Sequence, residues 1–114
     1  MSELLNVARF TVHTGKEDEA ADLVRQFVEI VREKDTRTLQ YDVFFHPGRG
    51  EYVFHERYED SDAVLEHVGN LGDRFGAMLA VSDLTVEIYG APSSALLAAT
   101  EGLDVTVYEL AHSL

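Results

Sequence analysis

Apolar residues recur along the chain with two different periods. A two-residue period is typical of strands, whose successive side chains point to opposite faces, whereas a period of three to four is typical of amphipathic helices. The two-residue period predicts strands over residues 4–12, 38–46, 51–58 and 83–89, with a short final strand over 104–110. The longer period predicts helices over about 15–34, 60–79 and 93–101.

Local motifs support these boundaries. Thr14 and Glu17 stand at the spacing of a capping box, in which Thr14 is the N-cap of the first helix and Glu17 reaches back to it. Residues 47–50, Pro-Gly-Arg-Gly, form a turn of the right length to join two strands as a hairpin. The second helix contains three glycines, Gly69, Gly72 and Gly76, each of which weakens it by up to about 1 kcal/mol. They indicate either a bend in the helix or a close approach of its backbone to a ligand or to the sheet.

The order of the elements predicts the fold class. Strand, helix, hairpin, helix and strand, with the usual right-handed crossovers, give a ferredoxin-like βαββαβ arrangement. We therefore expect an α+β fold with an antiparallel sheet and both helices on one of its faces. The whole chain, residues 1–114, is expected to be one domain, with its core over about 4–90 and a C-terminal extension over 91–114 that adds a short helix and a strand.

The second face of the sheet is predicted to be covered as well. A face open to water should carry mainly polar residues, but the strands here offer apolar side chains in both phases. Examples are the pairs Val7 and Phe10, Val43 and Phe44, and Val53 and Phe54. A second copy of the same sheet would cover this face, so we expect a homodimer. The alternative is that the C-terminal tail folds back over its own sheet.

Composition narrows the range of partners. The chain has 21 acidic and nine basic residues and a formal charge of −12, which argues against nucleic acid and against an anionic membrane surface as partners. It has no cysteine, which excludes disulfides, thiolate metal sites and cysteine nucleophiles. The N-terminus has no signal-peptide pattern, and no apolar stretch approaches the roughly 20 residues that span a bilayer. These features lead us to expect a cytoplasmic protein.

Four stretches of the sequence together carry a family resemblance. They are VARFTVHTGKEDE, TLQYDVFFHPGRGEYVFHERYED, AVLEHVGNLGDRFGAML and DLTVEIYG. In order and spacing they resemble the antibiotic biosynthesis monooxygenase-like family of dimeric α+β barrels, which includes quinol monooxygenases, over roughly residues 4–90. The resemblance implies a dimeric α+β barrel. It also implies oxidation of a quinol or a related aromatic by dioxygen, as some members carry out without a metal or flavin, and hence no cofactor.

The chain departs from the family pattern at two places. The Glu-x-Trp step common in the family is Glu56-Arg57-Tyr58 here, and the chain has no tryptophan. This argues against haem degradation, for which relatives use a set of Asn, Trp and His. The second helix of the family often carries two histidines, whereas here it has only His67, with Asp73 near the second position.

Two residues of the second helix are predicted to carry chemistry. His67 and Arg74 are seven residues apart, so on a continuous helix they would be nearly stacked at one edge of its apolar stripe, with Asn70 just outside them. His67 could accept the proton of a phenol, and Arg74 could hold the resulting phenolate. The structural alternatives are a boundary histidine bonded to solvent or backbone, and a surface ion pair of Arg74 with Glu66 or Asp73.

Further residues are expected to bind the substrate. Tyr58 and Phe75 would wall a pocket next to the helix, with Asn70 at its rim. Glu56 alternates with Phe54 and Tyr58 and is expected to point inward; a buried carboxylate needs a partner, for which we expect Arg9 or Arg57. The histidines show no close metal-ligand spacing, so no metal site is predicted.

Two functions remain open from the sequence. The first is a cofactor-independent monooxygenase that acts on a quinol or another electron-rich aromatic, with His67 and Arg74 as catalytic residues. The second is a non-enzymatic homodimer that binds a small ligand or serves a structural role; the missing tryptophan and the single helix histidine favour it.

Overall fold

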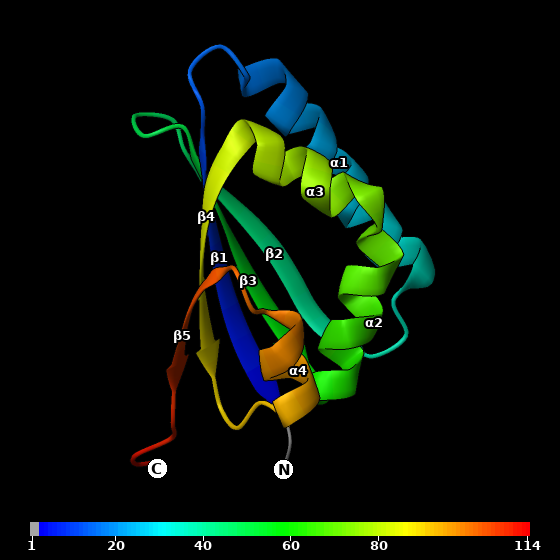
Figure 1. Cartoon of the computed structure of the whole chain (residues 1–114), viewed down its shortest axis with the longest axis vertical. Coiled ribbons are helices and arrows are strands. Elements are labelled where there is room, and N and C mark those ends of the chain that lie inside the picture. The colour runs from blue at the N-terminus through cyan, green and yellow to red at the C-terminus, as the bar shows by residue number, and fades with distance from the viewer. Residues whose placement is uncertain (1–2) are drawn as a thin grey trace.

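The computed structural model describes residues 3–114 as one five-stranded sheet with four helices (Figure 1). The elements in chain order are β1 (Leu4–Val12), α1 (Glu17–Lys34), β2 (Thr38–His46), β3 (Glu51–Tyr58), α2 (Ser61–Leu71), α3 (Asp73–Val81), β4 (Ser82–Tyr89), α4 (Ser94–Ala99) and β5 (Asp104–Tyr108). The predicted ferredoxin-like order is confirmed. Within the described residues, no helix combines the length and the apolar composition needed to cross a membrane.

The sheet has the strand order β2-β3-β1-β4-β5. The first four strands pair antiparallel, as predicted, whereas β5 pairs parallel to β4, so the complete sheet is mixed. Figure 1 shows α1, α2 and α3 together on one side of the sheet. Because β1 lies in the middle, its inward-facing side chains, including those of Leu4, Asn6, Ala8 and Phe10, form the floor beneath these helices.

An aromatic cluster joins the helices to the sheet. The rings of Phe10 and Phe54 are 5.4 Å apart between centroids, and Phe27 of α1 contacts both of them at 6.4 and 6.1 Å. All three side chains are buried. Such pairs add to the stability already gained from burying the rings, so this cluster fixes α1 on the sheet. At the other end of the helical layer, α2 and α4 pack on the sheet instead.

The predicted second helix is two helices. Gly72 has φ +55°, a left-handed conformation that glycine adopts without a steric penalty, and it ends α2 and begins α3. Of the two explanations that the sequence left open for the glycines, a bend is the one observed, and it lies at Gly72. Because the helix is not continuous, positions on either side of Gly72 no longer follow one helical wheel.

The predicted capping box at the start of the first helix is wrong. Helix α1 begins at Glu17 with Lys16 in the N-cap position, and no side chain caps it. Gly15 has φ +88° and turns the chain before the helix. The carboxylate of Glu17 does reach back, but it accepts from the backbone N–H of Gly15, at 3.0 and 3.2 Å, instead of joining a reciprocal pair with Thr14.

The C-terminal extension packs against its own chain. Ser93 caps α4 by accepting from the backbone N–H of Leu96 at 3.1 Å, as the sequence predicts, and the backbone N–H of Ser93 donates to the hydroxyl of Ser61 at 2.9 Å. Leu96 is buried in a cluster with Leu4, Tyr58, Ala63, Val64 and Ile88. Strand β5 extends the edge of the sheet at β4 and does not fold over its second face. The extension therefore covers the end of the helical layer next to α2 (Figure 1).

Candidate functional site

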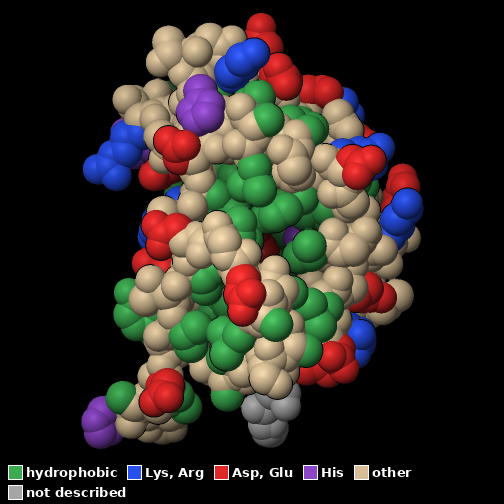
Figure 2. Space-filling model, viewed as in Figure 1, with side chains coloured by type: hydrophobic (Ala, Val, Ile, Leu, Met, Phe, Trp, Pro, Cys, Tyr) green, Lys and Arg blue, Asp and Glu red, His purple; other side chains and the backbone are tan. Residues whose placement is uncertain are grey.

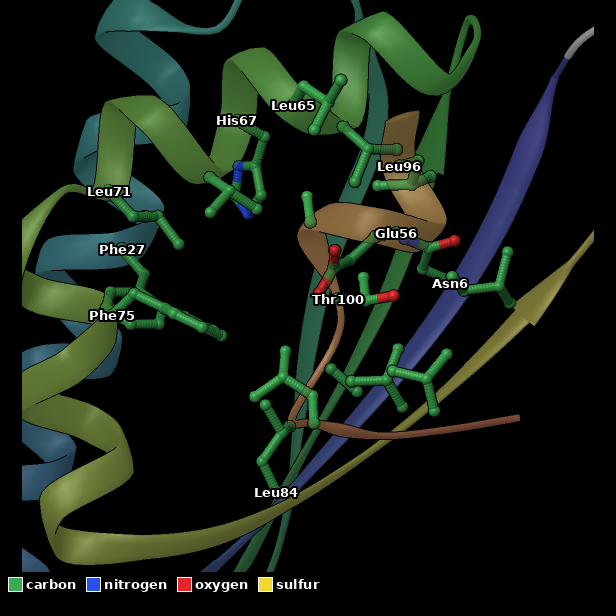
Figure 3. A pocket seen from close by; sticks show the side chains of 18 of the residues that line it. Asn6, Phe27, Glu56, Leu65, His67, Leu71, Phe75, Leu84, Leu96 and Thr100 are labelled. Carbon is green, nitrogen blue, oxygen red and sulfur yellow. The ribbon is translucent and has the colours of Figure 1, made fainter. Parts of the chain in front are cut away.

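A cavity of about 160 Å³ lies between the sheet and the helices. Figure 2 shows its opening, with acidic and histidine atoms visible inside, and Figure 3 shows the side chains around it. Every layer of the fold contributes to its lining, which consists of Asn6, Ala8, Phe10, Phe27, Tyr41, Glu56, Val64, Leu65, His67, Val68, Leu71, Phe75, Leu84, Val86, Ile88, Leu96, Ala99, Thr100, Leu103 and Val105. An apolar cavity with a few convergent polar groups is the usual form of a small-molecule site.

The ionisable groups of the lining are Tyr41, Glu56 and His67, and the lining includes no lysine or arginine. The sheet register places the polar groups side by side, because Glu56 of β3 pairs directly with Asn6 of β1 and with Tyr41 of β2. Among residues 3–114, no three Asp, Glu or His side chains are placed to hold a metal ion. The cavity thus has an apolar wall and one polar end.

His67 is held in place by an aspartate. Its Nδ1 lies 2.9 Å from Oδ2 of Asp35, the residue that follows α1, and both side chains are buried. Asn70 and Thr38 donate to the same carboxylate at 2.9 and 2.6 Å. Burial alone would raise the pKa of Asp35, but the hydrogen bonds from His67, Asn70 and Thr38 hold it below its ordinary value.

The ionised Asp35 determines which ring nitrogen of His67 carries the proton. An acceptor-only carboxylate at Nδ1 requires an N–H there, so in the neutral ring Nε2 is the free acceptor. Nε2 forms no hydrogen bond with a described residue, and His67 lines the cavity. The imidazole is also packed between two tyrosine rings, 5.1 Å from Tyr41 and 5.5 Å from Tyr58 between centroids. This is a fixed base that faces an apolar space.

Glu56 points inward, as expected, but the prediction that an arginine pairs with it is wrong. The hydroxyl of Tyr58 donates to Oε1 of Glu56. Arg57 instead pairs with Glu3 at 2.9 Å, and Arg9 lies 3.8 Å from Glu87, because both arginines project from the opposite face of the sheet. Burial raises the pKa of Glu56, although His67 and the Tyr58 hydroxyl act to lower it.

Tyr58 is buried and Tyr41 is partly buried, and both are poor bases. Burial, followed by the neighbouring charge of Glu56, raises the pKa of Tyr41 well above its ordinary value of 10.0, and the same causes act on Tyr58. Both hydroxyls therefore stay protonated over the range in which proteins work. Tyr58 serves as a hydrogen-bond donor to Glu56, so neither tyrosine is a candidate base, whereas the imidazole of His67 keeps a free ring nitrogen.

Residues 4–79, which are 76 of the 114 residues, match the model of a family described as antibiotic biosynthesis monooxygenase. The chain belongs to the antibiotic biosynthesis monooxygenase family. The match ends before β4, so α4 and β5 lie outside it. No curated protein matches the sequence closely enough to support an assignment.

Solved structures have the same fold. MupZ from Pseudomonas fluorescens has a TM-score of 0.78 at 15% identity, over 100% of this chain and 94% of its own. SnoaB from Streptomyces nogalater, a cofactor-independent oxygenase solved as a point mutant, has a TM-score of 0.67 at 18% identity, over 82% of this chain and 97% of its own. A crystal structure described as antibiotic biosynthesis monooxygenase has a TM-score of 0.70 at 25% identity, over 79% and 99%.

The structure brings together only part of the predicted site. His67, Glu56 and Phe75 line the cavity. Tyr58 contacts both Glu56 and His67 but is not part of the lining. Asn70 does not line it; its amide supports Asp35 instead.

Arg74 is separated from His67. It is exposed on α3, outside the cavity lining, and its Nε donates to the side chain of Gln26 at 2.8 Å. The stacking with His67 that the seven-residue spacing predicts is lost because the chain turns at Gly72 between the two residues. No ion pair joins Arg74 to Glu66 either, since Glu66 accepts from Thr36.

Asp35 and Asn6 are missing from the predicted site, although each left a signal in the sequence. Asp35 follows the C-terminus of a helix, where the helix dipole disfavours a negative charge. Asn6 is a polar residue in the inward phase of β1, between Leu4 and Ala8. Residues that contradict their local pattern are candidates for a functional role in this family member.

The raised pKa of Glu56 predicts a pH-dependent penalty on folding. The folded pKa lies above the ordinary value of about 4.5, so the wild-type free energy of unfolding should fall with rising pH between these two values, by up to about 1.4 kcal/mol per pH unit. Glu56→Gln keeps an acceptor for Tyr58 but cannot ionise. Relative to wild type, it should therefore gain stability as the pH rises above 4.5, as measured by urea unfolding. The exposed Glu59→Gln is the control, and an equal pH trend in both variants would contradict the assignment.

Proposed function

We propose that the protein is a cofactor-independent monooxygenase that acts on a single-ring quinol or another small, electron-rich aromatic. The observation that carries the proposal is the position of His67: Asp35 fixes its Nδ1, and the ring lines an apolar cavity next to Glu56. A base of this kind can deprotonate a phenol, and the phenolate then has enough electron density to react with dioxygen.

The size of the cavity suits one aromatic ring. An apolar protein cavity of about 150 Å³ is known to bind benzene, and the cavity here measures about 160 Å³. Phe27, Leu71 and Phe75 line the side facing the helices, and Leu84 and Val86 line the sheet side. These side chains would exclude water from the ring while it carries negative charge.

The substrate itself would supply the electrons. For hydroquinone, deprotonation by His67 begins a reaction in which one atom of dioxygen enters the ring and the other leaves as water, with hydroxybenzoquinone as the product. The ring is oxidised by four electrons, and dioxygen accepts all four. Glu56 in its protonated form would donate a hydrogen bond to the substrate oxygen; it takes the place of the arginine expected from the sequence, because no cation lines the cavity.

Membership of the family supports the reaction class. SnoaB, described as a cofactor-independent oxygenase, offers a precedent for oxygenation on this fold. At 18% identity, the likeness to SnoaB shows the fold, and oxygenation by the present chain is our proposal.

Oxygen uptake tests the proposed function. Purified protein, with a chelator present and no added cofactor, is expected to consume oxygen when given hydroquinone or methylhydroquinone, at a rate proportional to protein concentration and above autoxidation. The benzene analogues without hydroxyl groups should give none, because they have no proton for His67 to remove. Binding of quinols without oxygen uptake would instead support the non-enzymatic ligand-binding domain.

We also propose that the protein is a homodimer that pairs through the sheet face opposite the helices. Leu5 and Tyr89 are cross-strand partners on that face, Tyr89 stacks on Tyr108 with 5.0 Å between ring centroids, and Phe44 is 56% exposed. Polar residues such as Arg9 share the face, so it is less apolar than the sequence predicts. Light scattering should give the mass of two chains, and the mass of one chain would contradict the dimer.

A further inference from the structure

The C-terminal extension contributes one wall of the cavity. Residues 4–79, which match the family, contain none of this wall. In Figure 3, Leu96 and Thr100 of the extension lie on one side of the cavity, and Phe27 and Phe75 lie on the other. The lining residues of the extension come from α4, from the turn that follows it and from β5: Leu96, Ala99, Thr100, Leu103 and Val105.

Both ends of this wall are anchored to the core of the same chain. Before the turn, Leu96 is 1% exposed and packs with Leu4 and Ile88 of the sheet. After the turn, β5 pairs with β4, and Val105 lies opposite Val86 in that pairing. The position of the turn between these two anchors therefore does not depend on a partner chain.

The turn over residues 100–103 is the least buried part of the wall. Gly102 has φ +87°, and the backbone N–H of Leu103 donates to the carbonyl oxygen of Thr100 at 3.1 Å. The side chains of Thr100 and Leu103 line the cavity but are only half-buried. They lie at the edge of the cavity, and Leu103 is the larger and more apolar of the two.

The inner walls of the cavity cannot yield to a larger ligand in the same way. Phe10, Phe27 and Leu71 are no more than 2% exposed and belong to the main core cluster. Because protein interiors are close-packed, displacing such side chains costs stability. A ligand larger than one ring would have to extend toward the turn, where Leu103 occupies the space.

We propose that the C-terminal extension sets the size limit of the ligand, and that Leu103 is the residue that excludes a second fused ring. The protein would then accept single-ring quinols and reject quinols of naphthalene size. The size limit rests on the proposed function only in that the same cavity receives the substrate, because exclusion by size requires no reaction. Leu103 is thus a specificity-determining residue, and the base remains His67.

Binding measured by calorimetry under nitrogen tests the size limit. The two ligands, hydroquinone and naphthalene-1,4-diol, share a para pair of hydroxyl groups and differ by one fused ring. Wild-type protein is expected to bind hydroquinone at least about tenfold more tightly than naphthalene-1,4-diol. Equal affinities, or tighter binding of the larger ligand, would overturn the proposal, and no binding of hydroquinone would overturn it together with the proposed function.

Leu103→Ala is the decisive variant, because it removes most of the side chain at the edge of the cavity. It should raise the affinity for naphthalene-1,4-diol by at least about tenfold, since the released space can bury the second ring. The affinity for hydroquinone should stay within about threefold of wild type. An unchanged affinity for naphthalene-1,4-diol would remove Leu103 from the size limit.

Leu97→Ala is the matched control. Leu97 is a leucine of α4 that is 42% exposed and lies outside the cavity lining, so its truncation should change neither affinity. An equal gain for naphthalene-1,4-diol in Leu97→Ala and Leu103→Ala would assign the gain to loosening of the extension and would overturn the proposal.

Thermal unfolding without ligand gives a readout that a purely structural role for Leu103 would change. Because Leu103 is half-buried, Leu103→Ala should lose less stability than Leu96→Ala. An equal loss would place Leu103 in the core and contradict its position at the edge. If Leu103→Ala does not fold, Leu103→Val should still raise the affinity for naphthalene-1,4-diol, by a smaller factor, and no gain would overturn the proposal.

The size limit and the proposed function can fail separately. Preference for hydroquinone that Leu103→Ala relaxes, without oxygen uptake from either quinol, would keep the size limit and reject the oxygenase. Oxygen uptake by wild type from both quinols with equal kcat/KM would keep the oxygenase and reject the size limit.

Discussion

Replacing His67 with glutamine is expected to lower the rate of quinol-dependent oxygen uptake by about 10²- to 10⁴-fold, the usual contribution of a positioned general base. The glutamine amide can still donate to Asp35, so that buried carboxylate keeps a partner, but no group remains to accept the phenolic proton. The fall should be found mainly in kcat, because the apolar walls that bind the ring are unchanged. Initial rates at an oxygen electrode measure it.

Two comparisons separate a chemical role of His67 from a structural one. Asp35→Asn should lower the rate less than His67→Gln, since it removes only the group that fixes the tautomer and orientation of the imidazole. His46→Gln, at an exposed histidine at the end of β2, should leave the rate within about twofold of wild type. Comparable rates for wild type and His67→Gln would remove His67 from the mechanism.

Leu96→Ala is expected to lower the free energy of unfolding by about 2–5 kcal/mol, the range for truncation of a fully buried leucine. Leu96 is 1% exposed, and it packs on Leu4 and Ile88 of the sheet and Val64 of α2. The loss would show that the C-terminal extension is anchored within its own chain and forms part of the core. Urea unfolding followed by circular dichroism provides the measurement.

The neighbouring leucine is a matched control. Leu97 follows Leu96 on α4 but is 42% exposed, so Leu97→Ala should cost less than about 1 kcal/mol. Both variants keep the same helix and the same Ser93 cap, which makes burial the main difference between them. If the two substitutions destabilised the protein equally, α4 would not pack as the structure shows.

Regular periodicity made most of the fold predictable. The strands β1, β2 and β3 have the predicted bounds, because alternation in them reflects one buried face and because the turn at 47–50 fixes the hairpin. The order of elements then determined the sheet, apart from β5, whose parallel pairing with β4 follows from the crossover through α4. The extra helix in between was itself visible from its Ser93 cap.

The site was harder to predict, because its geometry depends on contacts between residues distant in sequence. His67 was found from its own helix, but Asp35, which orients it, lies 32 residues away in a loop. Arg74 was placed next to His67 by assuming a continuous helix. The break at Gly72 directs Arg74 away from the cavity and toward Gln26. Glu56, which was expected to pair with Arg9 or Arg57, instead accepts from Tyr58, since both arginines project from the other face of the sheet.

A crystal structure of the protein soaked with hydroquinone under nitrogen tests the central claim most directly. We predict electron density for one ring in the cavity, enclosed by Phe27 and Phe75, with one of its hydroxyl groups within hydrogen-bond distance of Nε2 of His67. An empty cavity at a saturating quinol concentration, or a ring bound only on the opposite face of the sheet, would contradict the account.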